Sequence, residues 1–236
     1  MTALGAAEPA LYRERGWVAP ATPLPAALLA PAVAAAERLR RERPWQELLS
    51  GVHNPFGQHA CLGEAWQFLD IAESAAVLDP LESLLGPDIV FWDSELFLDA
   101  GTIFWGEAAH WPVEPLAGAV VLLALSTGAM VIADIARLAA VGSALPLGAG
   151  AIYLLRYMPA NAHFNRDDDF AANRRAAEAR PLVNYAKRPL WLMRGRDRGD
   201  NDFAIGFMTP AACWGAVPEL PPETMAVSAA PAGKGE

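Results

Sequence analysis

Residues 89–112 read IVFWDSELFLDAGTIFWGEAAHWP, and this stretch decides the fold class. Short runs of β-branched, aromatic and aliphatic residues, separated by polar or glycine-containing breaks, predict strands at 89–92, 95–98 and 102–105. The same pattern recurs downstream and predicts strands at 119–125, 130–132, 151–155, 182–185 and 203–207. Many short strands that follow N-terminal helices predict a mainly β protein with a double-stranded β-helix core, as in jelly rolls and cupins.

The segment upstream of these strands has the pattern of two helices. Residues 12–18 have the composition of a short strand, and a helix is predicted within 25–43, regular from residue 31 onward. A second helix is predicted at 73–85, broken or restarted at a capping-box-like DPLE sequence at 79–82. It should end at Gly86, which can adopt the left-handed conformation that closes many helices.

Length and composition narrow the class of protein. The chain has 236 residues, which is enough for one domain with a sizeable core; we expect a flexible N-terminus at 1–10, a single domain at 11–215 and a disordered tail at 216–236. A net charge of -9 argues against nucleic-acid binding, which needs clustered Lys and Arg. The two cysteines, Cys61 and Cys213, form neither a disulfide framework nor a metal motif, and the N-terminus lacks a secretory signal. These features predict a cytoplasmic protein.

The most apolar part of the chain is a run of 18 uncharged residues at 116–133, near the lower limit for a membrane-spanning helix. A turn-like Ser126-Thr127-Gly128 interrupts this run, and β-favouring residues flank the turn. We therefore predict two buried strands and no spanning helix. The wider segment 115–155 carries few charges, which predicts a docking face for a protein partner or, alternatively, peripheral contact with a membrane complex.

Specific motifs add a family resemblance. They are His53-Asn54-Pro55-Phe56, residues 77–92, residues 94–98 and Trp111-Pro112. Together they resemble the phytanoyl-CoA dioxygenase-like family of iron(II)/2-oxoglutarate oxygenases, over roughly residues 12–192. The resemblance implies a double-stranded β-helix in which two imidazoles and one carboxylate hold iron(II) and leave positions for 2-oxoglutarate and dioxygen.

The iron ligands of that family are missing from the corresponding positions of this chain. Counting back from Trp111-Pro112 places Trp105 at the first histidine and Glu107 at the aspartate, and the second histidine falls on Ala160. An indole nitrogen is only a hydrogen-bond donor, and an alanine side chain has no donor atom for a metal. The link at 133–150 is also shorter than the family's lid segment. We therefore predict a catalytically degenerate pseudo-oxygenase without a cofactor, which acts as a binding or assembly subunit.

An active enzyme is the alternative prediction. Glu107, His110 and His163 supply one carboxylate and two imidazoles near the expected mouth of the barrel, and they could hold Fe(II) at a displaced site. Arg180 begins a segment that resembles the strand with which the family binds 2-oxoglutarate through a bidentate arginine. Such an enzyme would be a 2-oxoglutarate-dependent dioxygenase.

A third interpretation is a metal-free enzyme or a binder of small hydrophobic molecules, with Glu107 as an acid or base. Trp92, Trp105 and Trp111 surround the expected site, where they either fill the barrel or line a pocket for a flat apolar ligand. The acidic run at 167–169 lacks the glycine and the distant glutamate of a calcium loop, so we predict a solvated loop.

Overall fold

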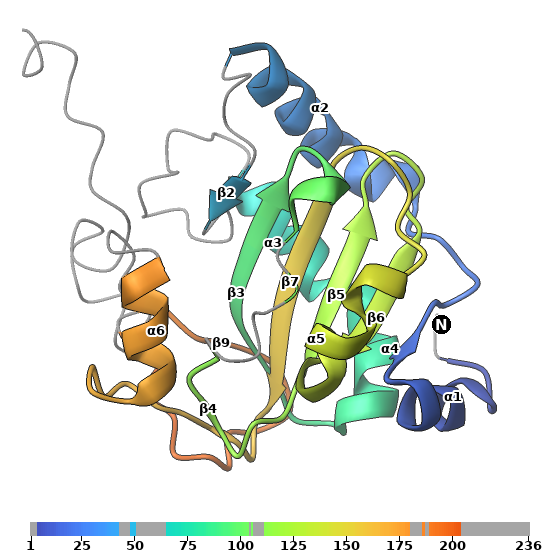
Figure 1. Ribbon diagram of the computed structural model, residues 1–236. Coiled ribbons are helices and arrows are strands. Elements are labelled where there is room, and N and C mark those ends of the chain that lie inside the picture. The colour runs from blue at the N-terminus through green and yellow to red at the C-terminus, as the bar shows by residue number, and fades with distance from the viewer. Residues whose placement is uncertain are drawn as a thin grey trace, which may run out of the picture.

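The protein is built around one large antiparallel sheet (Figure 1). The computed structural model describes residues 4–42, 48–50, 65–103, 105, 111–179, 186 and 189–203. The strand order is β1-β6-β5-β7-β3-β2, β9 pairs with β3, and β4 and β8 form a separate two-stranded sheet. The bounds of the strands are Trp17–Val18 (β1), Leu48–Ser50 (β2), Ile89–Phe97 (β3), Val113–Glu114 (β4), Ala119–Ala124 (β5), Met130–Asp134 (β6), Ile152–Pro159 (β7), His163–Phe164 (β8) and Trp191–Arg194 (β9).

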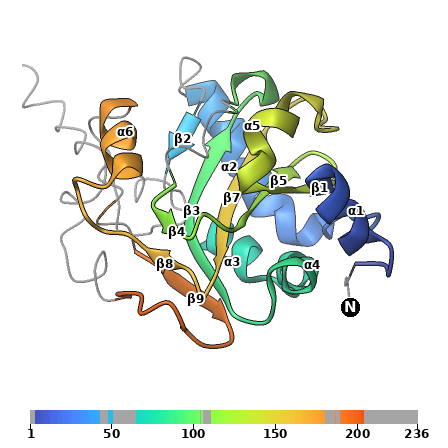
Figure 2. The same cartoon turned by 60° about the horizontal axis from the view of Figure 1, so that its bottom comes forward.

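Helices lie on both sides of the large sheet (Figure 2). They are α1 (Glu8–Arg15), α2 (Ala26–Glu42), α3 (Ala65–Glu73), α4 (Ala75–Leu85), α5 (Leu138–Val141) and α6 (Ala171–Ala179), with 3-10 turns at Ala100–Thr102, Ile135–Arg137 and Gly142–Ala144. Side chains of α1 to α4 pack with one face of the sheet in a first apolar core. The opposite face, here called the inner face, packs with α5, β4 and β8 in a second core.

Strand β7 shows how the two cores are separated. Tyr153 and Tyr157 point to the helical side, where their hydroxyls donate to the carbonyls of Phe68 and Ala72 in α3 at 3.3 and 2.8 Å. The alternate residues Ile152, Leu154 and Met158 point to the inner face. Both faces of the central strands are therefore buried, which explains why their sequences read as continuous apolar runs.

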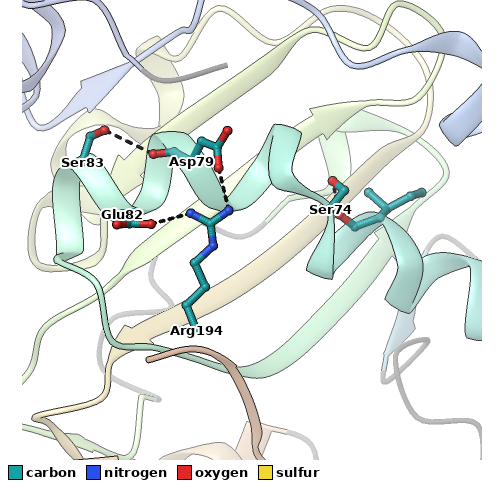
Figure 3. A network of polar contacts seen from close by, with 6 residues as sticks. Ser74, Asp79, Glu82, Ser83 and Arg194 are labelled. Carbon is teal, nitrogen blue, oxygen red and sulfur yellow. Dashed lines mark hydrogen bonds and ion pairs between the residues drawn. The ribbon is translucent and has the colours of Figure 1, made fainter. Parts of the chain in front are cut away.

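Helix α4 differs from the prediction at its start and in its middle. The break between α3 and α4 falls at Ser74, and α4 continues through Pro80 without a restart. The predicted capping box is wrong, because the Asp79 and Glu82 carboxylates instead accept hydrogen bonds from Arg194 of β9 at 2.6 and 2.5 Å (Figure 3). These ion pairs tie α4 to the edge of the sheet.

The other helix ends agree with the prediction in part. Helix α4 ends at Leu85, directly before Gly86, as predicted; Gly86 has a positive φ of 92°, but its ψ of -179° differs from the predicted left-handed helical conformation. Helix α2 begins at Ala26, earlier than predicted, and contains Pro31 in its interior. Residues 12–15 belong to α1, so only the end of the strand predicted at 12–18 forms, as β1.

The strand predictions need three corrections. Residues 89–92 and 95–97 belong to one strand, β3, with a bulge between Phe91 and Asp93, and Leu98 lies beyond its end. The strand predicted at 102–105 is wrong, since Thr102 ends a 3-10 turn that the Asp99 carboxylate caps. Strand β9 was not predicted. The strand predicted at 182–185 lies outside the described residues, as do residues 204–207 and the predicted tail at 216–236.

The apolar run at 116–133 forms the hairpin of β5 and β6, as predicted. The strands pair from Ala119 with Asp134 to Leu123 with Met130, and a tight turn joins them. Every residue of β5 is buried, so the apolar character of the run is used within the domain. Among the described residues, none of the helices has both the length and the apolar character needed to cross a membrane.

Candidate functional site

The inner face carries a cluster of charged residues beneath the second apolar core. Arg156 of β7 lies opposite Asp93 in the β3–β7 ladder. Its Nη1 is 3.0 Å from Asp93 Oδ2, and its Nη2 is 2.5 Å from Glu95 Oε2. Both carboxylates are 0% exposed and Arg156 is 3% exposed. Burial of charges at this level is tolerated in proteins only when they are paired, as they are here.

The bulge in β3 allows this cluster to form. In a regular strand neighbouring side chains alternate between the two faces, so Trp92 and Asp93 would point in opposite directions. The shift in register between Phe91 and Asp93 adds a residue to β3, so that Trp92 joins the inner core while Asp93 faces Arg156. The cluster thus depends on strand register, and the prediction from sequence missed it.

Aromatic rings surround the charged cluster. The Trp92 ring meets Trp111 edge to face at 5.0 Å and Phe164 of β8 at 5.5 Å, measured between ring centroids. The Arg156 guanidinium carbon lies 5.8 Å from the Trp92 ring centroid. Trp111 is 3% exposed, and its indole nitrogen has no hydrogen-bond partner in the part of the chain that the structure describes. Near the charges the inner face is thus packed with large apolar rings.

Trp105 and Ala160, the described positions where the sequence analysis predicted missing iron ligands, pack against neighbouring parts of the fold. Trp105 is half-buried and its indole packs against Gly142. A Cβ atom added at Gly142 would lie 2.4 Å from the indole ring. Ala160 is 0% exposed and follows β7. Its backbone N–H donates to the Asp88 carbonyl at 2.9 Å, and its carbonyl accepts from the Arg198 N–H at 2.7 Å. Neither position presents a metal-binding atom.

Comparison with known proteins identifies the fold. No protein-family model matches the chain, and no curated protein is significantly similar to it in sequence. Among solved structures, CytC3 matches with a TM-score of 0.52 and 15% identity, over 92% of this chain and 98% of that one. Apo ThoJ, a non-heme monooxygenase, matches with a TM-score of 0.51 and 16% identity, over 81% and 85% of the two chains. Its nickel complex gives 0.50 with the same identity and coverage. The chain therefore shares the overall fold of CytC3 and ThoJ.

Within this fold, His163 is the described member of the predicted displaced triad. It lies on β8 next to Phe164, and while the phenylalanine is buried in the inner core, the histidine side chain is exposed on the opposite side. Its Nδ1 is 3.0 Å from the Gly199 carbonyl, which can only accept, so Nδ1 carries the proton. Glu107 and His110 lie outside the described residues.

The remaining predicted site residues give no cluster of metal ligands. Arg180 lies outside the described residues, as do Cys61 and Cys213. Within the described ranges, no group of three or more His, Cys, Asp or Glu side chains could hold a metal ion. The acidic residues at 167–169 are exposed, as predicted for a solvated loop.

Arg166 is a further residue that the prediction did not single out. Its guanidinium donates to the carbonyls of Ala186 and Asp202, each at 2.7 Å, and lies 5.2 Å from the Phe164 ring centroid. Burial lowers the pKa of Arg166 to about 10, against the opposing effect of Asp202. The side chain remains charged at neutral pH and ties two distant segments to β8.

Proposed function

We propose that the chain is a catalytically degenerate member of the phytanoyl-CoA dioxygenase-like branch of the oxygenase fold. In this proposal β4 and β8 are a reduced second sheet of a double-stranded β-helix, and the domain serves as a binding or assembly subunit of a larger complex. The observation that carries the proposal is the burial of Ala160 at the position where the family has its second histidine. The backbone bonds of Ala160 to Asp88 and Arg198 hold this position in the fold and support the proposal.

The surroundings of Ala160 and Trp105 support the same conclusion. Iron(II) in this class of enzyme needs two imidazoles and a carboxylate on one face. Trp105 offers an indole and Ala160 a methyl group, and neither of these side chains can bind iron(II). The inner face is occupied instead by the rings of Trp92, Trp111 and Phe164 and by an ion cluster in which carboxylates meet a guanidinium.

An anaerobic titration with iron(II) and 2-oxoglutarate tests the loss of the metal site. After desalting, we expect the full-length protein to retain no iron above the level of an unrelated protein treated in the same way. We also expect no 2-oxoglutarate turnover when oxygen is admitted. Metal analysis and succinate release are the two measurements.

Variants of the displaced triad make this test decisive. Near-stoichiometric iron that disappears in His110→Ala and His163→Ala would overturn the proposal and establish the displaced site of Glu107, His110 and His163. If turnover also depended on Arg180, this residue would be the one that binds the carboxylate of 2-oxoglutarate. Because the His163 side chain is exposed, its removal should leave the fold intact, so any loss of iron would report on ligation.

The proposed role as a subunit points to the connection between β6 and β7. This connection lies at the surface, and its exposed residues include Ala139, Ala140, Ala144 and Pro146. Because these residues are small and uncharged, a partner could pack closely there.

We expect the tagged protein, isolated from its native cells, to elute in a complex larger than the 25.2 kDa of a single chain. Ala140→Glu should release the monomer, because it places a charge in the packed surface, whereas Ala34→Glu on the exposed side of α2 should not. Size-exclusion chromatography with light scattering measures both. Recovery of the unmodified protein as a lone monomer would contradict the assembly role, and an apolar molecule released on denaturation would favour the binder of small molecules.

A further inference from the structure

The charged cluster on the inner face has the composition of a binding site for a planar cation. We propose that Asp93, Glu95 and Trp92 form a guanidinium-binding site inside the oxygenase fold, and that the chain fills this site with its own Arg156. The contacts between β3 and β7 form this site whether or not the domain binds a partner. The ligand class is a guanidinium, and Arg156 supplies it.

The edges of the guanidinium meet the carboxylates. Nη1 bonds to Asp93 at 3.0 Å and Nη2 bonds to Glu95 at 2.5 Å, so separate amino groups serve separate acids. Hydrogen bonds between ionised partners are the strongest in proteins, and the guanidinium fork suits carboxylates better than any other cation. Since both acids are fully buried, removal of the cation would leave negative charges in an apolar core.

The guanidinium also lies over an aromatic ring. The guanidinium carbon is 5.8 Å from the Trp92 centroid, within the range of a cation–π contact. Trp111 and Phe164 hold the Trp92 ring in place from the other sides. The two carboxylates, one on each amino group, favour a guanidinium over an ammonium group, which lacks the fixed fork of donors.

The backbone fixes the position of this site. Asp93 pairs with Arg156 and Glu95 pairs with Leu154, in the ladder that joins β3 to β7. The acids therefore come from one strand and the cation from its neighbour, so the pairing needs no ordered loop. Arg156 therefore places one positive charge between the two buried acids.

Chemical rescue of Arg156→Ala tests the proposal. We expect this variant to melt about 10 °C below the unmodified protein, because its buried acids lose their cation. Millimolar methylguanidinium should raise its melting temperature by several degrees, and methylammonium at the same ionic strength should not. The unmodified protein should not respond, because Arg156 already fills the site. The variant that also carries Asp93→Asn and Glu95→Gln should not respond either.

An equal response of Arg156→Ala and of the triple variant to methylguanidinium would overturn the proposal, as would equal rescue by methylammonium. If Arg156→Ala does not fold, Arg156→Lys decides the question. The proposal expects Arg156→Lys to melt below the unmodified protein although the charge is kept, because the fork of donors is lost. A lysine variant as stable as the unmodified protein would show that any cation suffices, and would exclude a guanidinium site.

Discussion

Trp92→Ala is expected to lower the free energy of unfolding by about 3–5 kcal/mol, in the range of large-to-small substitutions of buried aromatic residues. Trp92 is 1% exposed, contacts Trp111 and Phe164, and lies 5.8 Å from the Arg156 guanidinium carbon. The substitution leaves a cavity among these groups and removes the aromatic wall of a buried cation. Urea unfolding followed by circular dichroism measures the loss.

The size of this loss distinguishes a filled barrel from an open pocket. If the rings around Trp92 lined a solvent-filled pocket, truncation would cost about 1 kcal/mol or less, because water already occupies the space. Trp17→Ala is the matched control, since Trp17 is only half-buried and Arg15 covers its ring at 3.9 Å. A loss for Trp92→Ala no larger than that for Trp17→Ala would contradict the filled interior and would favour a pocket for a flat ligand.

The parts of the fold that could be predicted are those that local sequence determines. The β5–β6 hairpin follows from two apolar β-favouring runs and the turn between them, where Gly128 adopts a φ of 73° against the Leu24 carbonyl. The end of α4 follows from Gly86 in the same way. In each case the residues that specify the conformation lie within a few positions of it.

The parts that could not be predicted depend on contacts between distant residues. Asp93-Ser94 looks like a turn between two strands, but β3 runs through it because Arg156 neutralises Asp93 from the adjacent strand. Likewise, Asp79 and Glu82 resemble a helix start, but they bind Arg194 from β9. Local propensity favours a strand break at the first place and a helix break at the second, but ion pairs with distant residues stabilise a continuous strand and a continuous helix.

The same distinction between local sequence and distant contacts applies to the candidate site. Trp105 and Ala160 could be excluded as iron ligands from their residue types alone, because that conclusion needs only the chemistry of an indole and a methyl group. The Asp93–Arg156–Glu95 cluster needed the register of β3 and β7 and the bulge that turns Asp93 inward. The available signal was the presence of charged residues inside strands that are otherwise apolar.

Gly118→Ala is expected to lower the free energy of unfolding by about 3 kcal/mol, through a forced close contact between β5 and β7. Gly118 precedes β5 with a φ of 148°, a conformation that side chains rarely allow. A Cβ atom would lie 2.3 Å from the Tyr157 carbonyl oxygen and 3.1 Å from the Trp111 ring. The backbone of β7 would have to move, and with it the packing of Trp111 against Trp92.

Gly150→Ala separates the steric part of this effect from the conformational part. Gly150 also has a positive φ, 103°, but a Cβ atom there would meet nothing within 4 Å. This control should therefore lose only the cost of the backbone conformation, about 1–2 kcal/mol. Urea unfolding compares the two stabilities, and near-ultraviolet circular dichroism should change for Gly118→Ala alone, because that substitution displaces a buried indole. Equal losses in both variants, with unchanged spectra, would mean that β5, β7 and Trp111 do not approach one another as closely as the fold requires.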